Sequence, residues 1–345
     1  MTSLHRFTTL DGLRGIAALA VMFHHFDHTL FSNASVAVDL FFALSGFVIA
    51  YSYYNKLHAD LSISTFIKKR FIRLYPMFLL GLILGGTALF VKFIHAQTDL
   101  TLIQIVSAFF LNIFYLPYLA DFYVQIGTDK IPSAIFPIND PSWSLFFEMF
   151  VNILFPFIIL FSKNAKFILT IVVLSAIGLV GYSLFTHTPT PGWGAKSFFG
   201  GIPRVFFSFF LGVFVFTIFN TIKAKFYNIN PVVILLALFL LLSFPYSGKI
   251  WLASTILIVP LFIIFGSIST SENPYINNIN EYLGWISYPL YCIHFPVLSL
   301  YSSFDIGYNI YLSTIICTVV SLFLSHLLAK YIDDPIRAKL SKKFI

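Results

Sequence analysis

The sequence predicts an all-α polytopic membrane protein with about ten membrane-spanning helices and both termini in the cytoplasm. Of its 345 residues, 58% are hydrophobic and only 10% are charged, and the mean hydropathy is +0.88. Soluble domains carry about 25% charged residues, so a soluble fold of this composition could not cover its core. The apolar residues also form long stretches with basic residues at their ends, which is typical of multi-pass membrane proteins.

Ten apolar stretches approach the roughly 20 residues that a spanning helix needs. The first is short enough to resemble the core of a signal peptide, but polar residues follow it in place of a small-residue cleavage site, so we expect a retained helix. The predicted spanning segments are Leu13–Leu30, Ser35–Tyr54, Tyr75–Ile94, Trp143–Phe161, Phe167–Phe185, Arg204–Asn220, Pro231–Tyr246, Ile250–Gly266, Trp285–Tyr301 and Asn309–Tyr331.

An eleventh apolar stretch, Ile105–Tyr118, is shorter and contains a proline and an asparagine. If it does not cross, about three quarters of the Lys and Arg residues lie on one side, which the positive-inside rule identifies as the cytoplasm. A further crossing would separate the basic cluster at 56–73 from the basic carboxyl-terminal tail. We therefore predict ten crossings, one membrane domain over residues 1–345, and an external or re-entrant excursion over residues 96–141.

The net charge of +7 does not indicate a nucleic-acid partner, because the basic residues lie at the ends of apolar stretches and do not interleave with aromatic residues on one patch. Membrane lipids are the expected surroundings. Cys292 and Cys317 both fall inside apolar segments, so they predict neither a disulfide framework nor a metal site.

Arg14 and His25 are the first ionisable residues that we single out for chemistry. They are eleven residues apart, which is roughly 16 Å along a helix, or about half the hydrocarbon thickness. With Arg14 at the cytoplasmic end, His25 would lie near the middle of the membrane. An imidazole there can exchange a proton with a substrate hydroxyl near neutral pH. The alternative is a packing histidine bonded to a neighbouring backbone.

Glu148 lies in an apolar segment, where a lone carboxylate needs a partner. It could pair with His25 and stabilise the imidazolium, or it could form a structural salt bridge with an arginine. Arg70 and Arg73 are three residues apart, so on a helix they share one face at the cytoplasmic mouth. Their guanidinium groups could hold the phosphates of a CoA thioester, or they could set topology and contact lipid headgroups.

Three further positions lie at or near bilayer depth. Asp39 stands near the outer start of the second segment, where a helix cap is the default interpretation. Ser45 and Gly46 form a small pair at which helices can approach closely. His294 lies near Tyr291 on the ninth segment and is either a core residue or a pocket-lining residue.

Four stretches in sequence order resemble acyltransferase family 3, bacterial membrane proteins that transfer acyl groups, usually acetyl, to extracytoplasmic sugars. The first is LDGLRGIAALAVMFHH, in which Arg14 and His25 have the spacing of the family motif. The others are VDLFFALSGFVIAY, the RFIR pair before LYP, and WSLFFE together with GWISYPLYCIHFP. The resemblance covers nearly the whole chain.

The resemblance implies that His25 is the catalytic base and Glu148 a supporting acid, and that Arg14, Arg70 and Arg73 are needed for donor use. It also implies acetyl-CoA as donor, no metal, and a location in the bacterial cytoplasmic (inner) membrane. The chain resembles the stand-alone form of the family, without a fused esterase-like domain. The supporting or pocket residues expected from the matching stretches are Asp39, Ser45, Trp143, Tyr291 and His294.

The expected function is therefore transfer of an acetyl group from cytoplasmic acetyl-CoA to a hydroxyl of an extracytoplasmic polysaccharide, such as the O-antigen of lipopolysaccharide. The alternative is a proton-coupled transporter or flippase of a glycan or lipid-linked substrate, because intramembrane His, Asp and Glu also form proton paths. The sequence shows no sign of the inverted repeat that many transporters contain, which argues against that alternative.

Overall fold

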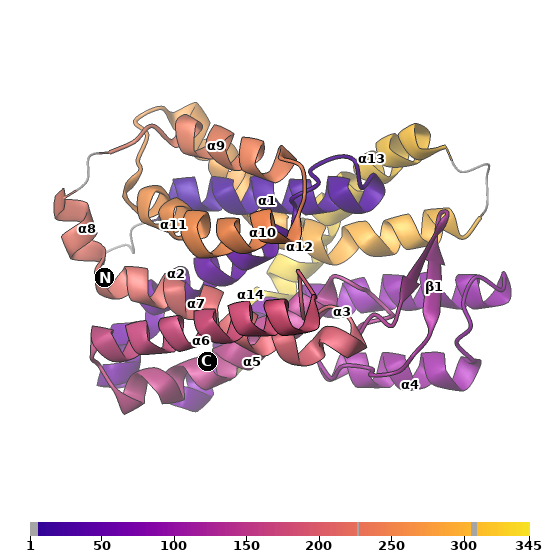
Figure 1. The fold of residues 1–345 in the computed structure, drawn as a ribbon, viewed down its shortest axis with the longest axis horizontal. Helices are drawn as coiled ribbons and strands as arrows, with labels where there is room; N and C mark the ends of the chain where they lie inside the picture. Colours follow the sequence, from indigo (N-terminus) through magenta and orange to yellow (C-terminus); the bar gives the residue numbers. More distant parts are fainter. Residues whose placement is uncertain (1–5, 226–227, 305–308) are drawn as a thin grey trace.

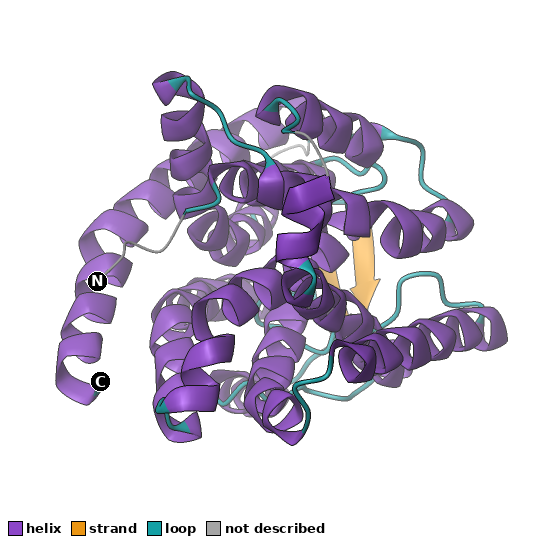
Figure 2. Cartoon of the chain, turned by 90° about the vertical axis from the view of Figure 1, so that its left-hand side faces the viewer, coloured by secondary structure: helices purple, strands orange, loops and turns teal. Residues whose placement is uncertain are grey.

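The computed structural model describes residues 6–225, 228–304 and 309–345, and helices dominate it (Figure 1). The long helices lie mostly along the longest axis of the molecule, and Figure 2 views the same bundle from one end. The helices are α1 (Thr8–Phe26), α2 (Ser35–Ala59), α3 (Ile63–Ile94), α4 (Leu102–Ile113), α5 (Ser142–Phe161), α6 (Ala165–Thr186), α7 (Gly201–Thr217), α8 (Phe219–Lys225), α9 (Pro231–Ser243), α10 (Gly248–Ala253), α11 (Val259–Ile268), α12 (Pro274–Ser302), α13 (Ile310–Leu328) and α14 (Asp334–Phe344). Short helical turns are η1 (Ala195–Gly200), η2 (Ser254–Ile258) and η3 (Ala329–Asp333), and the strands are β1 (Tyr123–Ile126) and β2 (Asp129–Pro132).

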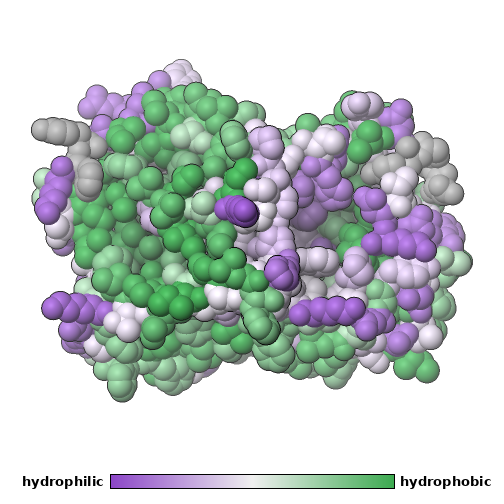
Figure 3. Space-filling view, viewed as in Figure 1, coloured by the Kyte–Doolittle hydropathy of each residue, from purple (hydrophilic) through white to green (hydrophobic). Residues whose placement is uncertain are grey.

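Within the described residues, eight helical segments are long and apolar enough to span a membrane. Two of the ten predicted segments fall outside this set, because polar residues lower the hydropathy of α1 and because α9 has only 13 residues. Large apolar side chains point outward, with Phe161 80% and Phe185 89% exposed, and apolar residues cover much of the face in Figure 3. The all-α polytopic membrane class is therefore confirmed.

Helix α3 begins well before the predicted segment. Its N-cap is Ser62, whose hydroxyl accepts a hydrogen bond from the Thr65 backbone N–H at 3.2 Å. The helix therefore includes the basic cluster and runs without a break from Ile63 to Ile94. Arg70 and Arg73 consequently project from the same helix that continues into the bundle.

The excursion predicted over residues 96–141 contains α4, the β1–β2 hairpin and a loop that leads to α5. The 12 residues of α4 extend about 18 Å, less than the roughly 30 Å of a hydrocarbon core. Just after α4, Tyr115 stacks on Phe78 in the middle of α3, with ring centroids 3.9 Å apart. The chain then enters the antiparallel hairpin, in which Tyr123 pairs with Pro132 and Ile126 with Asp129. This arrangement favours a re-entrant segment, and the assignment of its side stays a prediction.

A proline inside α12 fixes the loop before α5. Because Pro296 has no N–H, the carbonyl of Cys292 four residues earlier lacks its helical donor. The side-chain amide of Asn139 donates to this carbonyl at 2.9 Å. On the other side of the loop, the carbonyl of Ile138 lies where a Cβ at Gly85 would be, only 1.9 Å away. The loop is thus held between α3 and α12, and it positions the first turn of α5.

Small residues allow α2 and α7 to pack backbone against backbone. A Cβ at Gly46 would lie 1.9 Å from the carbonyl oxygen of Phe209, and a Cβ at Gly212 would lie 2.0 Å from that of Ala43. The close approach expected at the Ser45–Gly46 pair is therefore present, with α7 as the partner helix. It places Ser45, which precedes Gly46, at the edge of the cavity described below.

Candidate active site

Helices α1 and α12 pack side by side in parallel, which brings His25 to His294. Thr8 contacts Asn277 near the start of the two helices, and His25 contacts His294 near the end of α1, with both pairs 269 residues apart in sequence. A constant separation means that the two helices run in the same direction and in one register. A Cβ at Gly15 would collide with α12, so no larger residue would allow this approach.

The two imidazole rings form a hydrogen-bonded pair. Nδ1 of His25 lies 2.9 Å from Nε2 of His294, with ring centroids 5.1 Å apart and planes 20° from parallel. Nδ1 of His294 lies 2.9 Å from the carbonyl oxygen of Leu290. His294 is fully buried, whereas His25 is partly accessible and its ring is flanked by Phe295. His294, predicted as either a core or a pocket residue, therefore lies directly beside the candidate base.

A cavity of about 160 Å³ lies among α1, α2, α3, α5 and α12. It brings together five of the predicted site residues from four helices: Arg14, Ser45, Arg70, Arg73 and Glu148, and it also reaches Tyr291. The remaining lining residues are Val38, Phe41, Phe42, Val48, Ile49, Leu74, Ser144, Leu145, Ser287 and Tyr288. The cavity thus combines three guanidinium groups with one carboxylate and with apolar walls.

Glu148 is not the hydrogen-bond partner of His25 in the described structure. Its Oε1 accepts from the hydroxyl of Ser45 at 2.8 Å and lies 3.7 Å from a terminal nitrogen of Arg70. The sequence interpretation that paired Glu148 with His25 is therefore wrong, and the alternative of a salt bridge with an arginine holds. Helix α5 directs Glu148 toward α2 and α3, whereas His25 is bonded to α12. Hydropathy along the chain does not report which helices are neighbours, so it could not predict these contacts.

The arginines of this cavity retain donors for a ligand. Arg14 lies 3.8 Å from Asp11. Within the described residues, Nε of Arg70 is buried without a hydrogen-bond partner, and Arg73 forms neither a hydrogen bond nor an ion pair. Guanidinium groups bind phosphate oxygens through planar N–H pairs. The arrangement can therefore bind an anion between α3 and the rest of the cavity.

A second cavity of about 610 Å³ adjoins the first, because both are lined by Val48, Ile49, Arg70 and Arg73. Its other basic residues are Lys69 and Arg337, the latter on α14 and bonded to Asp333 at 2.9 Å. This cavity lies between α2, α3 and α14, near the carboxyl terminus. It forms a basic approach to the first cavity beside the last residue of the chain, Ile345.

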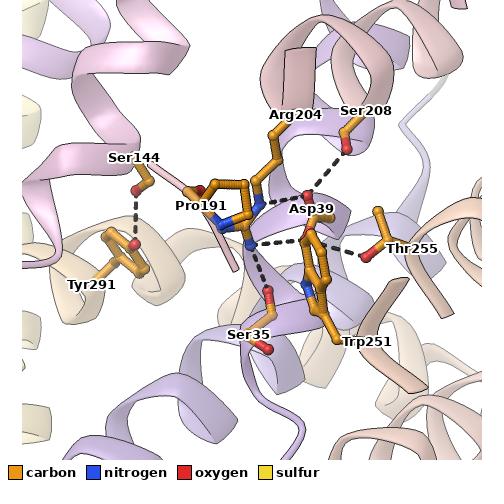
Figure 4. Close-up of polar contacts among 9 residues, drawn as sticks. All are labelled: Ser35, Asp39, Ser144, Pro191, Arg204, Ser208, Trp251, Thr255 and Tyr291. Atoms are coloured by element: carbon orange, nitrogen blue, oxygen red, sulfur yellow. Dashed lines mark hydrogen bonds and ion pairs between the residues drawn. The ribbon is translucent and has the colours of Figure 1, made fainter. Parts of the chain in front are cut away.

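Tyr291 connects the first cavity to the histidine pair. Its hydroxyl lies 2.7 Å from the hydroxyl of Ser144 and donates to the carbonyl of Pro141 at 3.2 Å, and Figure 4 shows the pair with Ser144. Its ring centroid lies 5.9 Å from that of His294. The residues thus follow one another from the basic cavity through Tyr291 to His294 and His25.

Asp39 is not a helix cap, contrary to the prediction. It is fully buried, and both its oxygens accept from Arg204 at 2.9 Å (Figure 4). Trp251 donates to it at 3.0 Å, and the guanidinium of Arg204 lies 5.1 Å from the ring centroid of Trp143. Asp39 and Trp143 therefore belong to a buried ion-pair network outside the cavity lining, which joins α2 to α7 and α10.

Sequence reasoning missed three contributors. Arg204 was predicted only as the first residue of a spanning segment, although a charge at the start of an apolar segment signals a buried partner. Ser144 and Arg337 carried no such signal, because a serine and a basic tail residue are common at these places. Within the described residues, Cys292 and Cys317 are free buried thiols, and no group of three or more His, Cys, Asp or Glu could hold a metal.

Comparison with known proteins gives matches of two kinds. Residues 7–330 match the acyltransferase domain of acyltransferase family 3. The chain is 34% identical to "Protein 2 in picA locus" of Rhizobium radiobacter, over 43% of this chain and 79% of that protein. It is 26% identical to the O-acetyltransferase OatA of Staphylococcus aureus, over 97% of this chain but only 58% of that protein. No solved structure matches. The match over nearly the whole chain shows that this protein belongs to acyltransferase family 3.

Proposed function

We propose that this protein is a membrane-bound O-acetyltransferase that transfers an acetyl group from cytoplasmic acetyl-CoA to a hydroxyl of an extracytoplasmic polysaccharide, such as the O-antigen of lipopolysaccharide. The family membership and the similarity to an O-acetyltransferase support acyl transfer. The observation that carries the proposal is the succession of two adjoining cavities with free guanidinium donors, then Tyr291, then the histidine pair.

The donor would enter by the second cavity, at the cytoplasmic mouth. CoA carries several phosphate charges, and Arg70 and Arg73 line both cavities with donors that the described protein leaves unused. Glu148 bonds to Ser45 and lies against Arg70, so it would hold that guanidinium in place and would not act on His25. The apolar wall residues of the first cavity would exclude water from the thioester.

The acceptor would enter from the external side, near His25. The imidazole of His25 removes the proton of the acceptor hydroxyl, and the resulting oxygen nucleophile attacks the acetyl carbonyl. The C–O bond forms, the C–S bond breaks, and the CoA thiolate takes up the proton from the imidazolium. Atoms and charge then balance without a metal or a further reactant.

The test is CoA release by the purified protein in lipid nanodiscs, with acetyl-CoA and a polysaccharide acceptor. We expect acceptor-dependent release by the native chain, and loss of at least about 10²-fold in His25→Ala because a general base contributes about 10²- to 10⁴-fold. The matched control is His24→Ala, which removes the preceding imidazole, bonded to the Leu30 carbonyl at 3.4 Å, and should retain activity. A transporter would release no CoA with any acceptor, and that result would contradict the proposal.

A further inference from the structure

The hydrogen bond of His294 to its own helix determines which of its nitrogens carries a proton. A carbonyl oxygen only accepts, so Nδ1 of His294, 2.9 Å from the Leu290 oxygen, must be the N–H donor. His294 is fully buried, and among the described residues no carboxylate contacts its ring or that of His25. Burial without a counter-charge disfavours a cation. The neutral ring then has a lone pair on Nε2.

This assignment determines the tautomer of His25. Nδ1 of His25 lies 2.9 Å from Nε2 of His294, which offers only a lone pair, so Nδ1 of His25 is the donor and carries the proton. In a neutral imidazole the other nitrogen is then an acceptor. The carbonyl of Leu290 thus determines, through two imidazoles, that Nε2 of His25 is the basic atom.

We propose that His294 is the positioning residue of the catalytic base: it holds His25 in the Nδ1–H tautomer and accepts the hydrogen bond that strengthens when His25 becomes charged. This inference rests on the proposed function of His25 as base. It gives His294 the task that a carboxylate has in hydrolytic triads. A neutral acceptor fulfils this task here without placing a second charge in the bundle.

During transfer, the proton of the acceptor hydroxyl goes to Nε2 of His25, while Nδ1–H stays bonded to His294. The imidazolium then returns the Nε2 proton to the departing thiolate. His294 keeps its own Nδ1 proton on the Leu290 carbonyl throughout. The pair therefore ends each cycle in the tautomers in which it began.

Two packing features hold His294 in this position. The parallel register of α1 and α12, with Gly15 against α12, keeps the two rings at hydrogen-bond distance. Tyr291, one turn before His294 and bonded to Ser144 of α5, fixes the same face of α12. Accordingly, a substitution of His294 should change the state of His25 more than it changes donor binding at Arg70 and Arg73.

The first test reads the tautomer and does not depend on activity. Solid-state NMR of protein labelled with ¹⁵N-histidine, in lipid at neutral pH, reports protonated and unprotonated ring nitrogens, and the signals of His25 are assigned by their loss in His25→Asn. We expect a protonated Nδ1 and an unprotonated Nε2 for His25 in the native chain. A His25 in the Nε2–H form would overturn the inference while leaving the proposed function intact.

The second test compares two substitutions in the CoA-release assay. His294→Phe removes the acceptor, and His294→Gln supplies an amide oxygen in its place. We expect His294→Phe to lower kcat by about 10²-fold, with the KM for acetyl-CoA unchanged within about twofold, and His294→Gln to recover about tenfold of that loss. Equal kcat in His294→Phe and the native chain, or no recovery in a folded His294→Gln, would overturn the role, whereas absence of transfer by the native chain would instead refute the proposed function.

Discussion

At the scale of single residues, Arg204 and Asp39 form a buried ion pair whose nitrogen and oxygen atoms all have hydrogen-bond partners. The guanidinium makes two bonds to the carboxylate and further bonds to the carbonyls of Pro191 and Ser35. Removing one member of a buried ion pair leaves an uncompensated charge, which costs about 3 to 5 kcal/mol. The network therefore acts as a structural joint between α2 and α7.

We predict that Asp39→Ala lowers the thermal stability of the purified protein strongly, by about 3 to 5 kcal/mol in free energy of unfolding. The matched control is Asp121→Ala, which removes an exposed carboxylate 3.8 Å from Lys196. Because exposed ion pairs contribute little, the control should melt like the native chain. Equal melting temperatures for both variants would show that the Arg204 network does not stabilise the fold.

Glu148 supports a second prediction at this scale. Because it lies against Arg70 and accepts from Ser45, Glu148→Gln keeps a hydrogen-bond acceptor but loses the charge beside the guanidinium. We expect the KM for acetyl-CoA to rise about tenfold, with kcat changed much less, in the CoA-release assay. A fall in kcat at unchanged KM would instead return Glu148 to the role of a partner of His25.

Asp140, in the loop before α5, gives a pH prediction. Its Oδ1 is buried without a hydrogen-bond partner among the described residues, and burial raises the pKa of the Asp140 carboxyl to about 7. In the unfolded chain an Asp carboxyl ionises near pH 3.9. Because the folded protein keeps the Asp140 proton up to about pH 7, the free energy of unfolding falls as the pH rises from about 4 through 7. Asp140→Asn should therefore melt like the native protein at about pH 3.5, below the pKa of an unfolded Asp, but at a higher temperature at pH 8. Identical melting curves at pH 8 would contradict this.

The sequence predicted which residues belong to the site, but it did not predict which residue each of them contacts. Arg14, Arg70, Arg73, Glu148 and Ser45 do line one cavity. The contact partners were harder to predict, because His25 and His294 are hydrogen-bonded although they lie 269 residues apart in sequence. No spacing rule along one helix reports such a contact, because it depends on which helices are neighbours.

At the scale of elements, hydropathy located a helix in each predicted spanning segment, but it placed the start of α3 too late. Polar and basic residues lower the hydropathy of residues 63–74, while they leave the helical hydrogen bonds intact and Ser62 caps them. The β1–β2 hairpin also went unpredicted. Its strands have four residues each, and so short an alternation carries little signal.

The crossing of α2 and α7 supports a prediction on an element. Gly46→Ala would place a Cβ 1.9 Å from the carbonyl oxygen of Phe209, so the helices must separate and the fold loses stability. The control is Gly181→Ala on α6, where nothing lies within 4 Å of the added Cβ. Alanine is the better helix former by about 1 kcal/mol, so the control should be neutral or slightly stabilising. If both variants insert and melt alike, the close crossing is not required.

At the scale of the whole molecule, the parallel packing of α1 and α12 bears on topology. Parallel neighbours cross the membrane in the same direction, so an odd number of crossings lies between them in sequence. That number is odd if every predicted segment between α1 and α12 crosses and α4 does not, and even if α4 crosses as well. The register of His25 with His294 therefore supports ten crossings, although the orientation of the termini stays a prediction.

Labelling with a membrane-impermeant maleimide tests this orientation. Cys292 and Cys317 are buried, so single added cysteines should dominate the signal. We expect Lys130→Cys, in the hairpin, to react in intact cells, and Lys342→Cys, near the carboxyl terminus, to react only after permeabilisation. The reverse pattern would place the second cavity, with its basic lining, on the external side. It would therefore contradict entry of the donor from the cytoplasm.

We propose that this chain acetylates a surface polysaccharide through His25. The most direct measurement is NMR of polysaccharide purified from cells that express the native chain, His25→Ala or His24→Ala at matched protein levels. We expect O-acetyl signals with the native chain and with His24→Ala, and none with His25→Ala. Equal acetylation in all three would contradict the role of His25, and acetylation in none would contradict the proposed acceptor.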